Sequence, residues 1–105
     1  MSGPETVAEA RAGAFTAAED GSHWSFDGAL TFDNAAAVLT AASALELPRS
    51  GRIDLSNLST VDSAALAVIF SLQRRAKAHR RNLVFEGIPP MLASLARVYG
   101  VEALI

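Results

Sequence analysis

Polar and apolar residues alternate over two short stretches near the N-terminus, which is the pattern of β-strands with one buried face. Residues 14–18 predict a first strand, and residues 23–27 alternate strictly, so that Trp24 and Phe26 point together toward the interior. A turn-forming Glu-Asp-Gly-Ser sequence separates the two stretches. We therefore expect an N-terminal β-hairpin, preceded by a flexible lead-in over residues 1–13.

Apolar residues recur at helical spacing in three later segments. Residues 34–47 predict a first helix, which Pro48 ends, and residues 91–99 predict a last helix, which Gly100 closes. Between them, residues 64–79 predict a longer helix. Five of its residues share one side and are expected to be buried: Ala65, Val68, Ile69, Leu72 and Ala76.

Two further strands flank the longest predicted helix. Residues 52–55 alternate between polar and apolar, and residues 82–87 contain an apolar segment after the helix. Because a helix connects them, these strands are expected to be parallel. The polar residues 56–63 are expected to form a loop. The whole pattern predicts a single α/β domain over residues 14–105, with a small mixed sheet, made of the N-terminal hairpin and parallel crossovers, and about three helices.

The composition excludes several classes of function but adds little about the fold. The chain has 105 residues, enough for one domain, and its formal net charge of −2 gives no basic field, so nucleic acid is not an expected partner. It has no cysteine, which excludes disulfides and thiolate metal sites and agrees with a reducing cytoplasm. Neither a secretory signal nor a long apolar run is found, so we expect a cytoplasmic protein that reaches a membrane only through partner subunits.

The sequence contains no assembled catalytic motif. P-loop, nucleophile-elbow and HExxH patterns are missing. Asp54 and Asp62 form the pair of carboxylates that could hold Mg²⁺ or accept a phosphoryl group. We discount this pair because no acidic cluster or catalytic lysine accompanies it. We expect a non-enzymatic binding protein without a cofactor or a metal.

The side of the longest helix opposite the buried stripe has the composition of a protein interface. Ala67, Phe70 and Arg74 lie there, and Leu66 lies at its edge. An aromatic ring beside a cation, with small residues that let another surface approach, is typical of an interface anchor. We interpret this side as partner-binding. A solvated helix face that contains one Phe is the alternative.

Asp62 and Ser63 stand where this helix begins, and either can be its N-cap. The free N–H groups and the helix dipole favour negative charge there, so binding of a small ligand or nucleotide is a further alternative. A dense basic run over residues 74–81 falls in the last turns, where cations complement the dipole. Attraction to an acidic subunit or to anionic lipid headgroups is a second explanation for that run.

The string IDLSNLSTVDSAAL, followed by an apolar helix, resembles the signature of the STAS domain family, which includes anti-sigma-factor antagonists and the tails of sulphate transporters. Residues 54–56 and 62–66 match the pattern of that family. The family usually has Gly where this chain has Ala65. The similarity extends from about residue 15 to residue 105 and implies a STAS fold.

Within the family, a stand-alone domain with Leu-Ala-Arg-Val-Tyr at residues 95–99 is similar to the MlaB-like subfamily, the cytoplasmic STAS subunits of phospholipid ABC transporters. This resemblance implies an accessory subunit that binds the transporter ATPase, in a complex with the permease at the inner membrane, and that supports assembly or activity in outer-membrane lipid asymmetry. The implied partner-binding residues are Asp62, Ser63, Leu66, Ala67, Phe70 and Arg74.

The family also implies an alternative function. In an anti-sigma-factor antagonist, a kinase would phosphorylate Ser63, and the added charge of about −1.5 to −2 beside Asp62 would repel the partner. The hydroxyl of Ser63 suits both functions, so the motif does not separate them. Self-association through Phe70 is left open as well.

Overall fold

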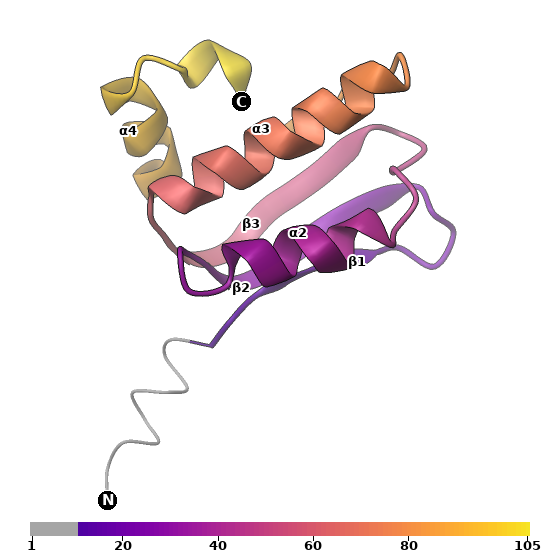
Figure 1. Ribbon diagram of the computed structural model, residues 1–105, viewed down its shortest axis with the longest axis horizontal. Coiled ribbons are helices and arrows are strands. Elements are labelled where there is room, and N and C mark those ends of the chain that lie inside the picture. Colours follow the sequence, from indigo (N-terminus) through magenta and orange to yellow (C-terminus); the bar gives the residue numbers. More distant parts are fainter. Residues whose placement is uncertain (1–10) are drawn as a thin grey trace, which may run out of the picture.

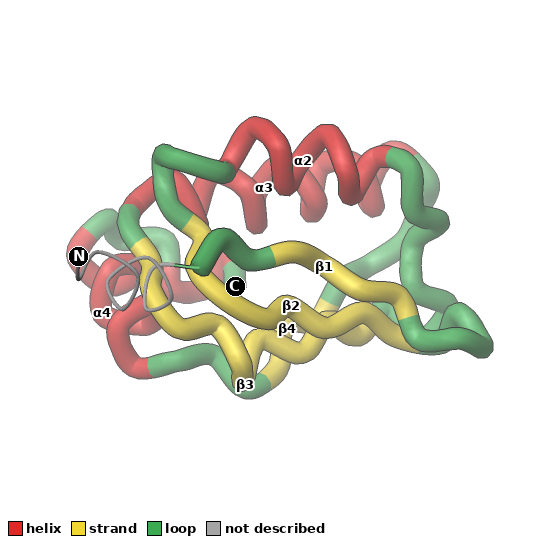
Figure 2. The backbone as a smooth tube through the Cα atoms, turned by 90° about the horizontal axis from the view of Figure 1, so that it is seen from below, coloured by secondary structure: helices red, strands yellow, loops and turns green. Residues whose placement is uncertain are grey.

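A mixed sheet forms one layer of the molecule, and two helices cover one of its faces (Figures 1 and 2). The structure is a computed structural model that describes residues 11–105. In this part of the chain the sheet has four strands in the order β1-β2-β3-β4, with β1 antiparallel to β2 and the other pairs parallel. The strands are β1 (Ala14–Ala17), β2 (His23–Leu30), β3 (Arg52–Val61) and β4 (Val84–Glu86). The predicted α/β class, the N-terminal hairpin and the parallel crossovers are confirmed.

The hairpin places three aromatic rings on the covered face of the sheet. Trp24 and Phe26 are completely buried, as their alternation predicted. Phe15 lies across the strand pair, with its ring centroid 5.5 Å from that of Trp24 and 4.9 Å from that of Phe26. The indole N–H of Trp24 donates to the carbonyl of Glu46 at 3.0 Å, so this buried donor is satisfied. The cluster fixes the hairpin on the core.

Residues 11–13, the described part of the expected lead-in, are hydrogen-bonded to the sheet. The N–H of Gly13 donates to the carbonyl of Ala29 at 2.8 Å, and the N–H of Ala29 donates to the carbonyl of Arg11 at 3.0 Å. Gly28 has φ +112°, and a Cβ there would lie 2.6 Å from Gly13 Cα, so both glycines permit this close crossing. The rest of the expected lead-in, residues 1–10, lies outside the described residues.

Three α-helices are found in the described residues: α2 (Ala35–Ser43), α3 (Ser63–Ala78) and α4 (Pro90–Val98). Helices α2 and α3 lie side by side on the sheet, and α4 lies beyond its edge near the beginning of α3 (Figure 2). All five residues of the predicted α3 stripe are buried. Ala65, where the family usually has Gly, is completely buried, so its methyl group fills the core.

Helix α2 is shorter than its apolar spacing predicted. We expected it to reach residue 47, but it ends at Ser43, and the chain then turns with hydrogen bonds from Ala44 and Leu45 back to carbonyls of the last helical turn. Arg75 of α3 donates to the carbonyls of Ala42 and Leu45. A side chain from a neighbouring helix thus occupies acceptors that a continuing helix would have used, and this partner was not visible in the local sequence.

The C-terminal segment folds back along α3. Helix α4 ends in a Schellman motif, in which Gly100 has φ +70° and Val101 donates to the carbonyl of Ala96 at 2.8 Å. A short 3-10 helix, η1 (Glu102–Leu104), follows, and Val101 and Ile105 pack on the core. Val98 is 79% exposed, because α4 buries only its Leu92 and Ala96 side deeply.

The largest correction concerns residues 56–61, which we expected to be a loop and which extend β3. The strand pairs with β2 from Arg52, opposite His23, to Val61, opposite Leu30. In a regular strand the next buried residue after Leu55 would be at position 57. Two register shifts each add one extra residue to β3, and the first of them places Leu58 on the buried side instead. The intervening polar residues lie largely on the uncovered side of the sheet, where polar side chains do not interrupt a strand.

Candidate functional site

Asp62 joins two segments at the beginning of α3. One carboxylate oxygen, Oδ1, accepts from the N–H of Ala64 at 2.8 Å, which makes Asp62 the N-cap of the helix. The other oxygen, Oδ2, accepts from the N–H of Phe32 at 3.0 Å, in the loop between β2 and α2. Both oxygens of Asp62 therefore hold backbone groups, and the residue has a structural role as well as a position beside Ser63.

This arrangement places Phe32 near the first turn of α3 with its side chain 73% exposed. Phe32 was not among the predicted partner-binding residues, because it stands in a short segment before the predicted first helix. The signal that could have identified it is a large aromatic residue in a polar turn, although a contact across thirty residues with Asp62 decides where that turn lies. An exposed ring held by a backbone hydrogen bond is suited to binding another surface.

The predicted partner-binding residues of α3 are not equally accessible. Ala67 and Arg74 are exposed, whereas Phe70 is half-buried against the core. Leu66 is only 4% exposed and belongs to the core. We expected Leu66 at the edge of the interface, and it does line the groove described below, but almost all of its side chain is packed in the core. Leu66 is therefore the floor of the surface rather than an accessible anchor.

A shallow groove of about 410 Å³ runs beside the first half of α3. Ser63, Ala67 and Phe70 form one side, and Tyr99 and Val101 form the other. The ring of Tyr99 is 58% exposed, so this residue, which was not among the predicted partner-binding residues, belongs to the surface. Within residues 11–105 the hydroxyl of Ser63 has no hydrogen-bond partner. The groove is therefore mostly apolar and carries the hydroxyls of Ser63 and Tyr99.

We call these residues together the docking surface: Phe32, Ser63, Ala67, Phe70 and Tyr99. The rings of Phe70 and Tyr99 line the groove beside Ala67, and the backbone of Phe32 is hydrogen-bonded to Asp62, the N-cap of the same helix. Aromatic residues are enriched in the cores of protein interfaces, and small residues permit close approach. The arrangement is suited to binding a protein surface and offers no enclosed cavity for a substrate.

The basic run has a role in addition to the one that we expected. Arg75 binds carbonyls at the end of α2, and Arg81 donates to the carbonyls of Pro48 and Arg49. These two cations therefore connect α3 and the turn after it to the chain that leaves α2. Arg75 also lies in the last turn of α3, where its charge complements the helix dipole. Arg74 and Lys77 are exposed and form no ion pair within the described residues.

Asp54, the first acidic residue of the family motif, lies far from Asp62. Since β3 continues between them, the eight intervening steps along an extended strand separate their backbones by roughly 26 Å. Hydrogen bonds from the backbone N–H and the hydroxyl of Ser56 hold the pKa of the Asp54 carboxyl below its ordinary value. The two carboxylates cannot share one ion, and no group of three or more His, Cys, Asp or Glu residues suited to a metal occurs in residues 11–105.

The helices offer no candidate for a membrane span. Across residues 11–105, each helix is too short or too polar to cross a bilayer.

The two-layer fold with a serine at the beginning of a long helix after a β-strand defines the class of protein. A STAS-domain family model matches residues 14–105, so the chain belongs to the STAS domain family. The description of that model is "Mlab, STAS domain", which places the match among MlaB-like members. No curated protein matches the chain. Membership supports a non-enzymatic regulatory or accessory role.

Proposed function

We propose that this protein is a MlaB-like accessory subunit that binds the cytoplasmic ATPase of a phospholipid ABC transporter, in a complex with the permease, and promotes assembly or activity of the transporter. The name of the matching family model supports the subfamily. The observation that carries a binding role is the docking surface, where exposed Phe32 and Tyr99 flank a helix that presents Ala67. In this function the protein reaches the inner membrane through its partners.

The mechanism is rigid docking. The helix α3 is anchored on the core by its buried stripe, so its outer side does not need to fold when a partner binds. The ATPase would bury the rings of Phe32 and Tyr99 and approach the helix backbone closely at Ala67. Ser63 would lie at the edge of the contact, where a backbone N–H or carboxylate of the partner can bind its hydroxyl.

Copurification with the transporter ATPase and permease from the same source tests this proposal. Ala67→Arg places a long charged side chain in the groove and is expected to weaken ATPase binding by about 100-fold, the effect of losing a central contact. Ala78→Arg is the matched control, because Ala78 is an exposed alanine at the other end of α3. The proposal is wrong if the parent does not recover the ATPase, or if both variants recover it equally.

A second function, that of an anti-sigma-factor antagonist, is favoured by the free hydroxyl of Ser63. A phosphate on Ser63 would sit beside the carboxylate of Asp62, whose two oxygens already accept hydrogen bonds. The added negative charge would lie in the docking surface and repel an acidic partner there. Recovery of a serine kinase-like anti-sigma factor that Ser63→Glu releases would support this function and exclude the transporter subunit.

A further inference from the structure

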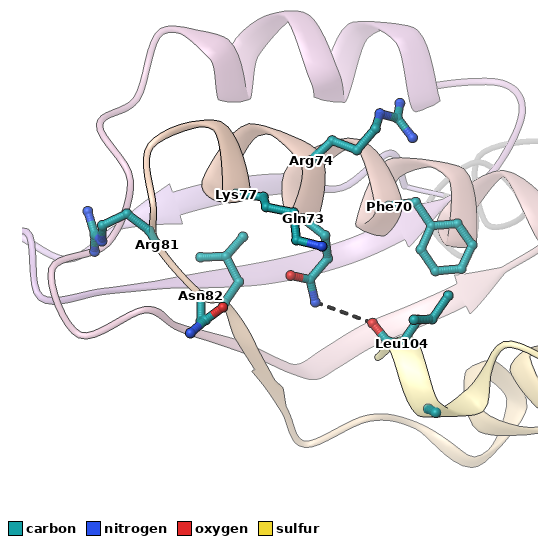
Figure 3. Close-up of a pocket in the computed structure, with 9 residues that line it drawn as sticks. Phe70, Gln73, Arg74, Lys77, Arg81, Asn82 and Leu104 are labelled. Carbon is teal, nitrogen blue, oxygen red and sulfur yellow. Dashed lines mark hydrogen bonds between the residues drawn. The ribbon is translucent and has the colours of Figure 1, made fainter.

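A second groove, of about 500 Å³, lies along the last turns of α3 between that helix and the C-terminal segment (Figure 3). Phe70 and Gln73 point from α3 toward Leu104, and the side-chain amide of Gln73 donates to the carbonyl of Leu104 at 3.3 Å. This bond holds the C-terminal wall in place. Arg81 and Asn82 lie at the far end of the groove. We call it the cationic groove.

The charges of the cationic groove all have one sign. Arg74, Lys77 and Arg81 line it, and no carboxylate is among its lining residues. The guanidinium of Arg81 is used by backbone carbonyls, and Arg74 donates to the hydroxyl of Ser71 at 3.2 Å. The ion pairs found within residues 11–105 involve other residues, so the charges of Arg74 and Lys77 are not neutralised by the described chain. This contrasts with the net charge of −2 for the whole protein.

The walls of the cationic groove are partly apolar. Phe70 stands at the end next to the docking surface, and Leu83 and Leu104 contribute apolar surface farther along. A free anion would use the cations and leave these side chains exposed to water. A concave groove also fits an extended or helical chain better than it fits a flat membrane surface. An occupant that satisfies both features carries carboxylates and at least one large apolar side chain.

We propose that the cationic groove binds an acidic segment of the partner protein, with an apolar side chain of that segment against Phe70 and Leu104 and its carboxylates near Arg74 and Lys77. Because Phe70 lines both grooves, one partner can occupy the docking surface and the cationic groove together. The inference deepens the proposed function, because it assigns this segment to the ATPase.

Direct binding of synthetic peptides tests the inference. The probes are a fluorescent peptide rich in Asp and Glu with a central Phe, the same peptide with Ser in place of Phe, and a Lys-rich peptide with the Phe. Fluorescence anisotropy measures affinity, and NMR follows the side-chain amide of Gln73. We expect only the acidic Phe peptide to bind saturably and to shift that resonance, with weaker binding as salt is raised.

The charge variants decide where the peptide binds. Arg74→Glu/Lys77→Glu is expected to weaken peptide binding roughly tenfold, since two attractive exposed charges become repulsive. Arg80→Glu is the matched control, because Arg80 is exposed in the turn after α3 and does not line the groove. The inference is overturned if the double variant binds the peptide like the parent. It is also overturned if vesicles containing phosphatidylglycerol bind through Arg74 and Lys77 while the acidic peptide does not.

Parallel measurements with the ATPase separate the two proposals. Ala67→Arg should weaken ATPase binding while leaving peptide binding unchanged, whereas Arg74→Glu/Lys77→Glu should weaken the binding of both the ATPase and the peptide. If the parent binds the peptide but no ATPase, the proposed function fails and the cationic groove stands. If Ala67→Arg weakens ATPase binding but Arg74→Glu/Lys77→Glu does not, the docking surface is supported and binding of an acidic segment in the cationic groove is refuted.

Discussion

The uncovered face of the sheet and the docking surface differ in how their side chains are already used. On the uncovered face, Arg52 donates to Glu86 at 2.9 and 2.7 Å, which raises the pKa of Arg52 above its ordinary value, and Asp54 binds Ser56. Arg52, Asp54 and Glu86, with Ser22, His23 and Ser50, line a polar groove of about 430 Å³. The docking surface instead presents exposed rings and a free hydroxyl. The polar groove on the uncovered face is therefore less suitable for binding a partner than the docking surface, because its main charged groups already have partners.

The largest expected effect is a difference in unfolding free energy between variants of two neighbouring residues of α3. Leu66→Ala is expected to lower the free energy of unfolding by about 2–4 kcal/mol, because it leaves a cavity under the groove. Ala67→Arg should change that free energy by no more than about 0.5 kcal/mol, since Ala67 is exposed. Urea denaturation of both variants measures the difference. Equal stabilities would show that the floor of the groove is not part of the core.

A smaller effect should distinguish the two oxygens of Asp62. Asp62→Ala removes the cap of α3 and is expected to cost about 1–2 kcal/mol of unfolding free energy. Asp62→Asn should cost less, because the amide oxygen can still cap the helix, but its NH₂ group cannot accept the N–H of Phe32.

Comparing Asp62→Asn with the parent isolates the role of Phe32. If Phe32 is an anchor, Asp62→Asn should weaken ATPase binding severalfold while the helix content, measured by circular dichroism, is kept. Phe32→Ala should weaken binding further. Val84→Ala is the control, because Val84 is exposed on the uncovered face of the sheet. An equal loss of binding in Phe32→Ala and Val84→Ala would remove Phe32 from the docking surface.

Breaking the ion pair of the uncovered face should have a still smaller effect. Glu86→Gln removes the carboxylate that binds Arg52, and exposed pairs of this kind contribute little because water and salt screen them. We expect a denaturation midpoint close to that of the parent at high salt and unchanged ATPase binding. Loss of ATPase binding in Glu86→Gln would show that the uncovered face of the sheet takes part in binding the ATPase.

The smallest expected effect is a pH dependence at Asp54. Because its folded-state pKa is lowered, the charged carboxylate stabilises the fold above the ordinary value of 3.8, and this contribution is lost as pH falls through the folded-state pKa. Urea midpoints of the parent and Asp54→Asn should therefore differ near neutral pH and converge in acid. If the difference between the two urea midpoints instead grew as pH fell, the lowered pKa of Asp54 would be contradicted.

The comparison also shows which site residues a sequence can identify. The outer position of Ala67, Phe70 and Arg74 was predictable because helical spacing separates the outer side of α3 from its buried stripe, and their role in binding a partner stays a prediction. Helical spacing did not predict the burial of Leu66, because it lies at the boundary between the two sides and only the folded core shows how little of it is exposed. Phe32 and Tyr99 were missed because each joins the surface only through contacts distant in sequence.

The fold class, the hairpin, the parallel crossovers and the buried stripe of α3 could all be predicted from the sequence, since each follows from a local period of apolar residues. That residues 56–61 belong to β3 became visible only in the folded molecule, because backbone pairing with β2 and two bulges override a polar composition. The same is true of the end of α2 at Ser43 and of the position of Phe32 beside α3, because Arg75 and Asp62 bind backbone groups about thirty residues away. Local patterns cannot encode such partners, because they exist only after the layers have packed.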